Sequence, residues 1–186
     1  MKVLGISGSL RRDSHNTKLL RASAALLPPG AELELWEGLK AVPPYDGDDD
    51  NGEPRAWILQ SLDAAIRDAD VVLFATPEYN HSIPGQLKNA LDWLSRPLKT
   101  SPLRNKPVAV VGASTGLFGA VWAQAELRKV LTAIGARVVD RELPVGLADD
   151  AFTEEDRRLA DSDLELTLAD LLAELLAEVD VVEVAA

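Results

Sequence analysis

Residues 7–17 gather the kinds of side chain that hold phosphate groups in proteins. The segment offers glycine, hydroxyl and amide groups together with Arg11 and Arg12. A phosphate needs convergent N–H and O–H donors at a helix N-terminus, where the helix dipole adds a favourable potential, and an arginine can contact two of its oxygens. The whole set predicts a phosphate site, whereas Ser14 or Asn16 taken alone would more simply cap the next helix.

The glycine spacing in this segment indicates which kind of phosphate group it could bind. Leu10 and Arg11 stand where the dinucleotide fingerprint Gly-x-Gly-x-x-Gly would need further glycines, and the Gly-Lys-Ser/Thr ending of a Walker A loop is absent. These differences favour a terminal monophosphate over a bridging pyrophosphate or a triphosphate.

Residues 76–85 form a second unusual segment, which Pro77 and Pro84 make rigid. A planar ring needs a flat wall to stack on and hydrogen-bond donors along one edge. Backbone N–H groups of a rigid turn can supply the donors, and Tyr79 or Pro84 can supply the wall. The alternative is an ordinary turn with Tyr79 packed at the surface.

Residues 112–119 contain Gly-Ala-Ser-Thr-Gly, which matches the Gly-x-Ser-x-Gly elbow of the α/β-hydrolases. A hydrolase of that fold has its histidine after the serine along the chain, but His15 and His81 both precede Ser114. The segment therefore lacks the base that a hydrolase needs. Its small residues instead allow a planar ring to approach the backbone closely.

Each of the three segments follows a predicted strand. Strands are expected at about residues 2–7, 32–36, 71–75, 107–112 and 136–140. Helices are expected at about residues 14–27, 55–67, 86–94, 119–134 and 153–179. This alternation predicts a doubly wound α/β fold, a five-stranded parallel sheet with helices on both faces, in which ligands bind beyond the carboxyl ends of the strands. The leucines of the last helix are expected to pack on that sheet.

Composition excludes several classes of function. The 186 residues suit a single domain, 1–186, and they carry a net charge of −11, which argues against nucleic-acid binding because such binding needs a basic footprint. The absence of cysteine excludes disulfides, iron–sulfur clusters and thiol nucleophiles. No run is apolar enough for a membrane span and the opening residues are unlike a signal peptide, so a cytoplasmic protein is expected.

No metal site is predicted. Asp46, Asp48 and Asp50 alternate as in a calcium-binding loop. Asn51 and Trp57, however, stand where that loop needs its glycine and its bidentate glutamate. A solvated acidic turn is the simpler interpretation, and the two histidines lie on different loops without the spacing of metal ligands.

Taken together, the three segments resemble the NADPH-dependent FMN reductase family, in particular its bacterial quinone, chromate and azo-dye reductases. The matching stretches are residues 8–16, 77–93 and 112–116, and the similarity extends to about residue 145, roughly three-quarters of the chain. The middle stretch is long enough that chance is a poor explanation. The resemblance implies a flavodoxin-like fold with the strand order 2-1-3-4-5.

The resemblance also implies which residues hold FMN. Those expected at its phosphate are Ser9, Arg11, Ser14, Asn16 and Thr17. Those expected at the isoalloxazine ring are Pro77, Glu78, Tyr79 and Asn80, with Ser114, Thr115 and Gly116 on its other side. Because the cofactor carries the chemistry, no side-chain acid or base is obligatory and no catalytic residue is named, although Glu78 and Tyr79 are expected nearest the ring.

The implied activity is that of an FMN-dependent NAD(P)H oxidoreductase. Such an enzyme takes a hydride from NADPH or NADH and reduces a small oxidant, such as a quinone, azo compound, chromate or free flavin, in a ping-pong cycle. Members are typically homodimers or homotetramers, and residues 86–93 and the helix after Gly119 are candidates for that contact. Two other interpretations stay open: a flavodoxin-type electron carrier with little NAD(P)H activity, and a binding module without enzyme activity.

Overall fold

A twisted parallel sheet organises the chain, as seen in a computed structural model that describes residues 1–50, 55–153 and 158–183. The strands are β1 Lys2–Ser7, β2 Glu32–Trp36, β3 Val71–Ala75, β4 Pro107–Ala113 and β5 Arg137–Val138. Their order, β2-β1-β3-β4-β5, and their parallel pairing confirm the predicted flavodoxin-like sheet. A further strand, β6 Pro144–Val145, extends the five predicted strands and pairs with the carboxyl end of β4.

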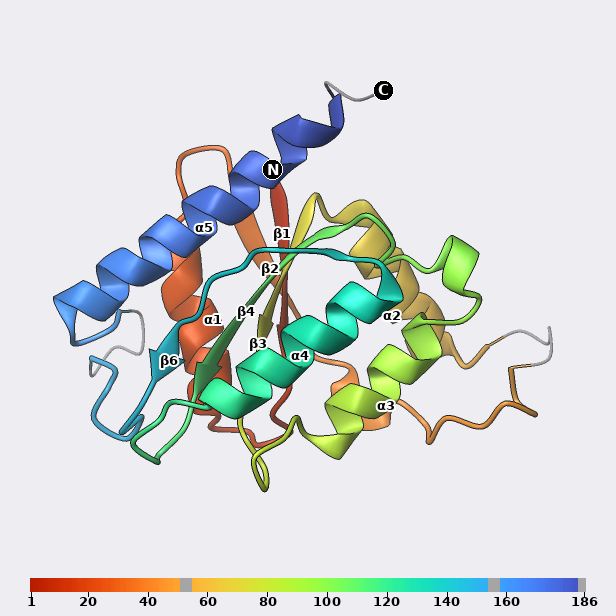
Figure 1. Cartoon of the computed structure of the whole chain (residues 1–186), viewed down its shortest axis with the longest axis horizontal. Helices are drawn as coiled ribbons and strands as arrows, with labels where there is room; N and C mark the ends of the chain where they lie inside the picture. Colours follow the sequence, from red (N-terminus) through yellow and green to blue (C-terminus); the bar gives the residue numbers. More distant parts are fainter. Residues whose placement is uncertain (51–54, 154–157, 184–186) are drawn as a thin grey trace.

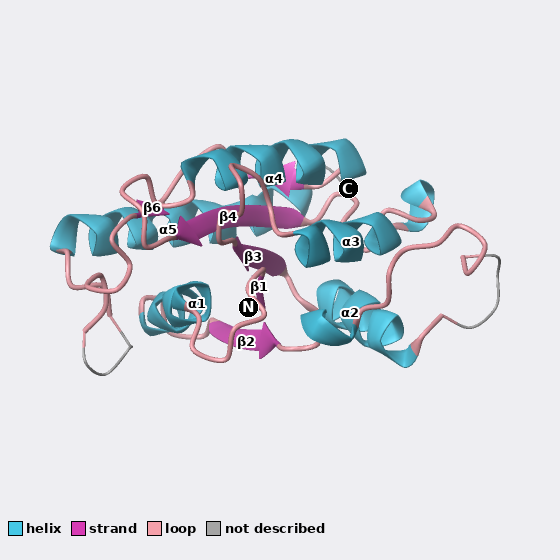
Figure 2. Cartoon of the chain, turned by 90° about the horizontal axis from the view of Figure 1, so that it is seen from below, coloured by secondary structure: helices cyan, strands magenta, loops and turns pink. Residues whose placement is uncertain are grey.

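Helices cover both faces of this sheet. They are α1 His15–Ala25, α2 Trp57–Asp68, α3 Gly85–Leu94, α4 Val121–Ile134 and α5 Ser162–Glu183, with short 3₁₀ turns η1 Leu39–Ala41 and η2 Leu98–Thr100. In Figure 2, α1 and α4 lie on opposite sides of the strands. None of the described helices is long and apolar enough to cross a membrane.

Alternate residues of β3 belong to two hydrophobic cores, one on each face of the sheet. Val72 and Phe74 pack with apolar side chains of α2, α3 and α4, whereas Val71 and Leu73 pack with those of α1 and α5. Figure 1 shows α1 to the left of the sheet and α2 and α3 to its right. Both faces of the central strands are therefore buried, which explains why these strands appear in the sequence as unbroken apolar runs.

The last helix begins later than the sequence predicts. Its predicted start near residue 153 is wrong, since α5 begins at Ser162, and part of the predicted range, 154–157, lies outside the described residues. The Asp161 carboxylate accepts hydrogen bonds from the N–H groups of Asp163 (2.8 Å) and Leu164 (3.3 Å), which caps the helix there. The predicted packing of α5 on the chain's own sheet is confirmed for Leu168, Leu171, Leu172, Leu175 and Leu176, which are buried in the same core as β3 and β4.

Candidate functional site

A cavity of about 150 Å³ lies at the carboxyl ends of β1, β3 and β4, where the loops after these strands meet. The loops after β1, β3 and β4, within residues 7–17, 76–85 and 112–119, are the first, second and third loop below. The cavity is lined by Ser9, Arg11, Ser14, His15, Asn16, Pro77, Glu78, Tyr79, Ala113, Ser114 and Thr115. Nine of the twelve residues proposed from the sequence are among them. Of the other three, Thr17 lines a neighbouring cavity, and Asn80 and Gly116 are exposed and line neither cavity.

Ser14 caps α1 at the edge of this cavity. Its hydroxyl oxygen accepts hydrogen bonds from the N–H groups of Asn16 (3.2 Å) and Thr17 (3.4 Å), and the residue is buried. The capping role considered from the sequence is thus real. It does not exclude a ligand contact, because a hydroxyl that accepts two bonds still has its own proton to donate.

The Asn16 side chain joins the first loop to the third. Its amide nitrogen donates to the Ala113 carbonyl (2.9 Å), and its amide oxygen accepts from the Ala113 N–H (3.0 Å). Asn16 is only 2% exposed, so these bonds are shielded from water. The amide is already engaged with the backbone, and its evident function is to hold two walls of the cavity together.

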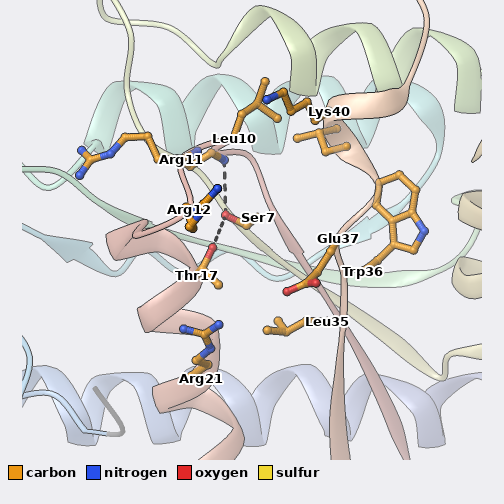
Figure 3. Close-up of a pocket in the computed structure, with 12 residues that line it drawn as sticks. Ser7, Leu10, Arg11, Arg12, Thr17, Arg21, Leu35, Trp36, Glu37 and Lys40 are labelled. Carbon is orange, nitrogen blue, oxygen red and sulfur yellow. Dashed lines mark hydrogen bonds between the residues drawn. The ribbon is translucent and has the colours of Figure 1, made fainter. Parts of the chain in front are cut away.

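Arg11 is the cation at this cavity. Its guanidinium makes a single long hydrogen bond, from Nη2 to the Asp13 carbonyl (3.3 Å), and no ion pair with any residue that the structure describes. Figure 3 shows the Arg11 side chain directed away from Trp36 and Lys40. Its planar donor fork is therefore available to an anion such as a terminal phosphate.

His15 is a cavity residue that the sequence reasoning missed. Its ring stacks on Phe152 with centroids 6.1 Å apart, and Nε2 lies 3.1 Å from a carboxylate oxygen of Asp149. Nδ1 is buried and has no hydrogen-bond partner among the described residues. A buried nitrogen without a partner is costly unless a ligand or water satisfies it. Its position between Ser14 and Asn16, within the segment predicted to bind phosphate, was the sequence feature that could have identified it as a site residue.

Glu78 links the second loop to α4. One carboxylate oxygen, Oε2, accepts hydrogen bonds from the N–H groups of Trp122 and Ala123, both at 3.1 Å. Ala120 at the N-cap of α4 has no side chain able to do this. A carboxylate at a helix N-terminus also interacts favourably with the helix dipole. Glu78 therefore positions the cavity wall as well as lining it.

The second loop makes a tight turn that presents Tyr79. Backbone hydrogen bonds run both ways between Tyr79 and Ser82, at 3.0 and 3.1 Å, and Asn80 and His81 adopt positive φ angles of 54° and 61°. This turn leaves the Tyr79 side chain 49% exposed beside the cavity. The geometry agrees with a wall on which a planar ring can stack.

Exposed aromatic side chains of the third loop and of α4 lie beside the second loop. Phe118 and Trp122 meet edge-to-face with centroids 5.2 Å apart, and His81 meets Trp122 in the same way at 4.8 Å. Leu117 and Phe118 are 72% and 61% exposed, which is unusual for side chains of this size. A cavity lined by the Arg11 guanidinium and by a histidine with an unpartnered nitrogen, near exposed rings, fits a molecule with a phosphate at one end and a flat ring at the other, as FMN has.

Comparison with known proteins places this arrangement in a family. A model of the NADPH-dependent FMN reductase family matches residues 1–150. The chain is 42% identical over 175 residues to an NAD(P)H-dependent FMN reductase of Pseudomonas aeruginosa, covering 93% of this chain and 92% of that protein. It is 38% identical over 141 residues to a quinone reductase of Escherichia coli, covering 76% of this chain and 74% of that protein.

Solved structures agree with the fold. FerB of Paracoccus denitrificans, a flavoenzyme NAD(P)H:(acceptor) oxidoreductase, superposes with a TM-score of 0.81 at 31% identity, covering 96% of this chain and 97% of that chain. A flavodoxin of Pseudomonas aeruginosa superposes with a TM-score of 0.60 at 20% identity, covering 94% and 99% of the two chains. The second likeness concerns the fold alone.

Proposed function

The chain belongs to the NADPH-dependent FMN reductase family, and on that basis we propose that it is an FMN-dependent NAD(P)H oxidoreductase that reduces a small oxidant of the quinone class. The observation that carries the proposal is the cavity formed jointly by the loops after β1, β3 and β4, inside the region that the family model matches. The quinone class comes from the relatives that are named quinone reductases.

FMN, when bound, supplies the chemistry of accepting a hydride and passing electrons on. The protein then has to bind FMN, orient it and shield it from water. Arg11 and the hydroxyl of Ser9 are suited to the phosphate, His15 Nδ1 to a polar group in the cavity, and Tyr79 to the ring. Since Glu78 is occupied with the N-terminus of α4, we assign it a positioning role and name no side-chain acid or base.

The flavodoxin-type electron carrier is the second candidate function. The observation in its favour is the shared fold, together with an acidic net charge of −11 that suits basic partners. At 20% identity the flavodoxin is a far more distant relative than the reductases at 38% and 42%. We therefore favour the reductase over the carrier, and over a binding module without activity.

Assembly into a homodimer or homotetramer is part of the proposal. The exposed apolar side chains of Leu117, Phe118, Trp122 and Leu147 support it, because they form the kind of surface that a second copy can cover. Trp122 lies in α4, one of the two helices named from the sequence for this contact, the other being α3. A single domain over residues 1–186 and a cytoplasmic location stay predictions from the sequence.

Steady-state kinetics test the proposed function. Protein loaded with FMN should oxidise NADPH or NADH in the presence of a benzoquinone, and double-reciprocal plots at several fixed quinone concentrations should be parallel, as a ping-pong cycle requires. Loss of the rate after removal of FMN serves as the control. Absence of NAD(P)H oxidation by FMN-loaded protein would exclude the reductase.

Replacing Arg11 by alanine should weaken FMN binding by about tenfold to a hundredfold, the usual worth of a hydrogen bond to a charged group. The free energy of unfolding should hardly change, since Arg11 is exposed and makes only one long hydrogen bond. Fluorescence titration of FMN measures the affinity, with Arg104→Ala as a control that removes another exposed arginine, one that does not line the cavity. An unchanged dissociation constant would exclude Arg11 from the phosphate site.

Replacing His15 by phenylalanine should weaken FMN binding without lowering the stability of the apoprotein. The new ring can keep the stack on Phe152, and removal of the unpartnered Nδ1 offsets the loss of the contact between Nε2 and the exposed Asp149 carboxylate, so the apoprotein should be about as stable as before. Affinity for FMN should fall by about five- to tenfold, because one hydrogen bond of ordinary strength is lost. Thermal unfolding measures the stability and FMN titration the affinity. Equal affinities of the variant and the wild type for FMN would show that Nδ1 does not contact the ligand.

A further inference from the structure

A second cavity, of about 290 Å³, lies on the other side of the first loop from the candidate FMN site. It is situated at the carboxyl ends of β1 and β2, between α1 and η1, and Figure 3 shows the side chains around it. Its volume is at the lower end of the range for small-molecule sites, which suits one half of a dinucleotide. Ser9 and Arg11 line both cavities, so the two are neighbours.

This second cavity concentrates positive charge in an acidic protein. Four of its lining side chains are cationic and only Glu37 is acidic, although the whole chain has a net charge of −11. The side chains of Arg12, Arg21 and Lys40 have no ion pair or hydrogen bond within the part of the chain that the structure describes. Like charges that line one cavity without partners repel each other, and an anion in the cavity would relieve that repulsion.

The other lining groups suit a nucleoside. The Trp36 indole forms one side of the cavity and is held by a hydrogen bond from its Nε1 to the Ser61 hydroxyl (3.3 Å). An indole held in this way is a stacking surface for a base. The Glu37 carboxylate, which follows β2 directly, can accept a hydrogen bond from a ribose hydroxyl. An acidic residue near the end of the second strand has this role in doubly wound dinucleotide-binding folds, where a nearby arginine instead accommodates a 2′-phosphate.

We propose that this cavity binds the adenosine 2′-phosphate end of NADPH and makes the chain prefer NADPH to NADH. The inference rests on the proposed function, which requires a nicotinamide donor beside the FMN site. The two donors differ by the 2′-phosphate alone, and the unpaired charges of Arg12, Arg21 and Lys40 outnumber that of Glu37. Arg21 on α1 holds the phosphate and Lys40 in η1, at the opposite end of the cavity in Figure 3, adds positive potential, while Glu37 accepts from the remaining ribose hydroxyl.

The test compares two double variants that remove the same charge. Arg21→Ala with Lys40→Ala changes the second cavity, and Lys99→Ala with Arg104→Ala removes two exposed cations that line neither cavity. Michaelis constants are measured for NADPH and NADH with FMN-loaded protein. Calorimetry on the same proteins measures binding of adenosine 2′,5′-bisphosphate against adenosine 5′-monophosphate, which needs no turnover.

The wild type should bind the bisphosphate more tightly than the monophosphate. The cavity variant should lose this difference, and its KM for NADPH should rise about tenfold or more while its KM for NADH stays within about twofold. The control variant should behave as the wild type. Equal rises for both donors, or undiminished bisphosphate binding by the cavity variant, would overturn the inference and leave the reductase function intact. If neither donor reduces the bound flavin, the proposed function fails, and the calorimetry alone decides whether the cavity takes the 2′-phosphate.

Discussion

Replacing Asn16 by leucine is expected to lower the free energy of unfolding by about 3 kcal/mol and to weaken FMN binding at the same time. The side chain makes two buried hydrogen bonds to the backbone of Ala113, so its loss leaves a buried N–H and a buried C=O without partners. Each such group costs about 1–3 kcal/mol. Urea unfolding followed by circular dichroism measures the stability.

The effect on binding follows from what Asn16 connects. It joins the loop that carries Arg11 to the end of β4, from which Ser114 and Thr115 extend into the same cavity. Without this link the two walls are no longer held at a fixed separation. Asn105→Gly is the control, because Asn105 is exposed and its φ of 60° is one that glycine adopts readily. Equal stability of Asn16→Leu and the wild type would contradict the role given to this contact.

Replacing Gly119 by alanine is expected to lower the free energy of unfolding by about 3 kcal/mol, the sum of backbone strain and overpacking. Gly119 has a φ of +56°, and a Cβ there would lie 2.3 Å from the carbonyl carbon of Pro144 and 2.5 Å from the nitrogen of Val145. Backbone atoms cannot rotate aside as side chains do. The substitution must therefore push β6 away from the third loop, including the hydrogen bond from Ser114 N–H to the Val145 carbonyl (3.0 Å).

Gly85→Ala is the matched control for Gly119→Ala. Apart from its chain neighbours and the backbone of its own helix, no atom lies within 4 Å of a Cβ built at Gly85, which is the first residue of α3 and has no positive φ. Alanine there should raise the stability by about 0.5 kcal/mol, because it restricts the unfolded chain and favours the helix. Chemical unfolding measures the free energy of unfolding of both variants. Equal values for Gly119→Ala and Gly85→Ala would show that the third loop has room to adjust.

The central strands could be predicted from the sequence because burial on both faces leaves an unmistakable apolar run. The prediction for residues 71–75 matches β3, and that for residues 107–112 ends one residue before β4 does. The short strands β5 and β6 were harder to predict from the sequence. Only Arg137–Val138 pair in the fifth strand, and Pro144–Val145 in the sixth is too brief for any periodicity. These segments are strands because β4 offers them a neighbour, and such pairing is a property of the folded chain.

The residues of the candidate site could also be predicted in part, whereas the contacts between them could not. Side-chain types at the ends of three strands were enough to bring nine of the twelve proposed residues to one cavity. The contacts that hold its walls were not predictable, because Asn16 meets Ala113 and Glu78 meets Trp122 across 97 and 44 positions of the chain. Such contacts depend on how loops lie against each other. The same is true of His15, whose unpartnered nitrogen is evident only once its surroundings are known.

The most direct test of the account is a visible absorption spectrum of the protein after mixing with FMN and desalting, followed by addition of NADPH without oxygen. A retained flavin spectrum that bleaches promptly is the predicted result, because it requires both an FMN site and reduction by a nicotinamide. A retained spectrum that neither NADPH nor NADH bleaches would contradict the reductase and favour the electron carrier. A protein that retains no flavin would contradict the proposed FMN site itself.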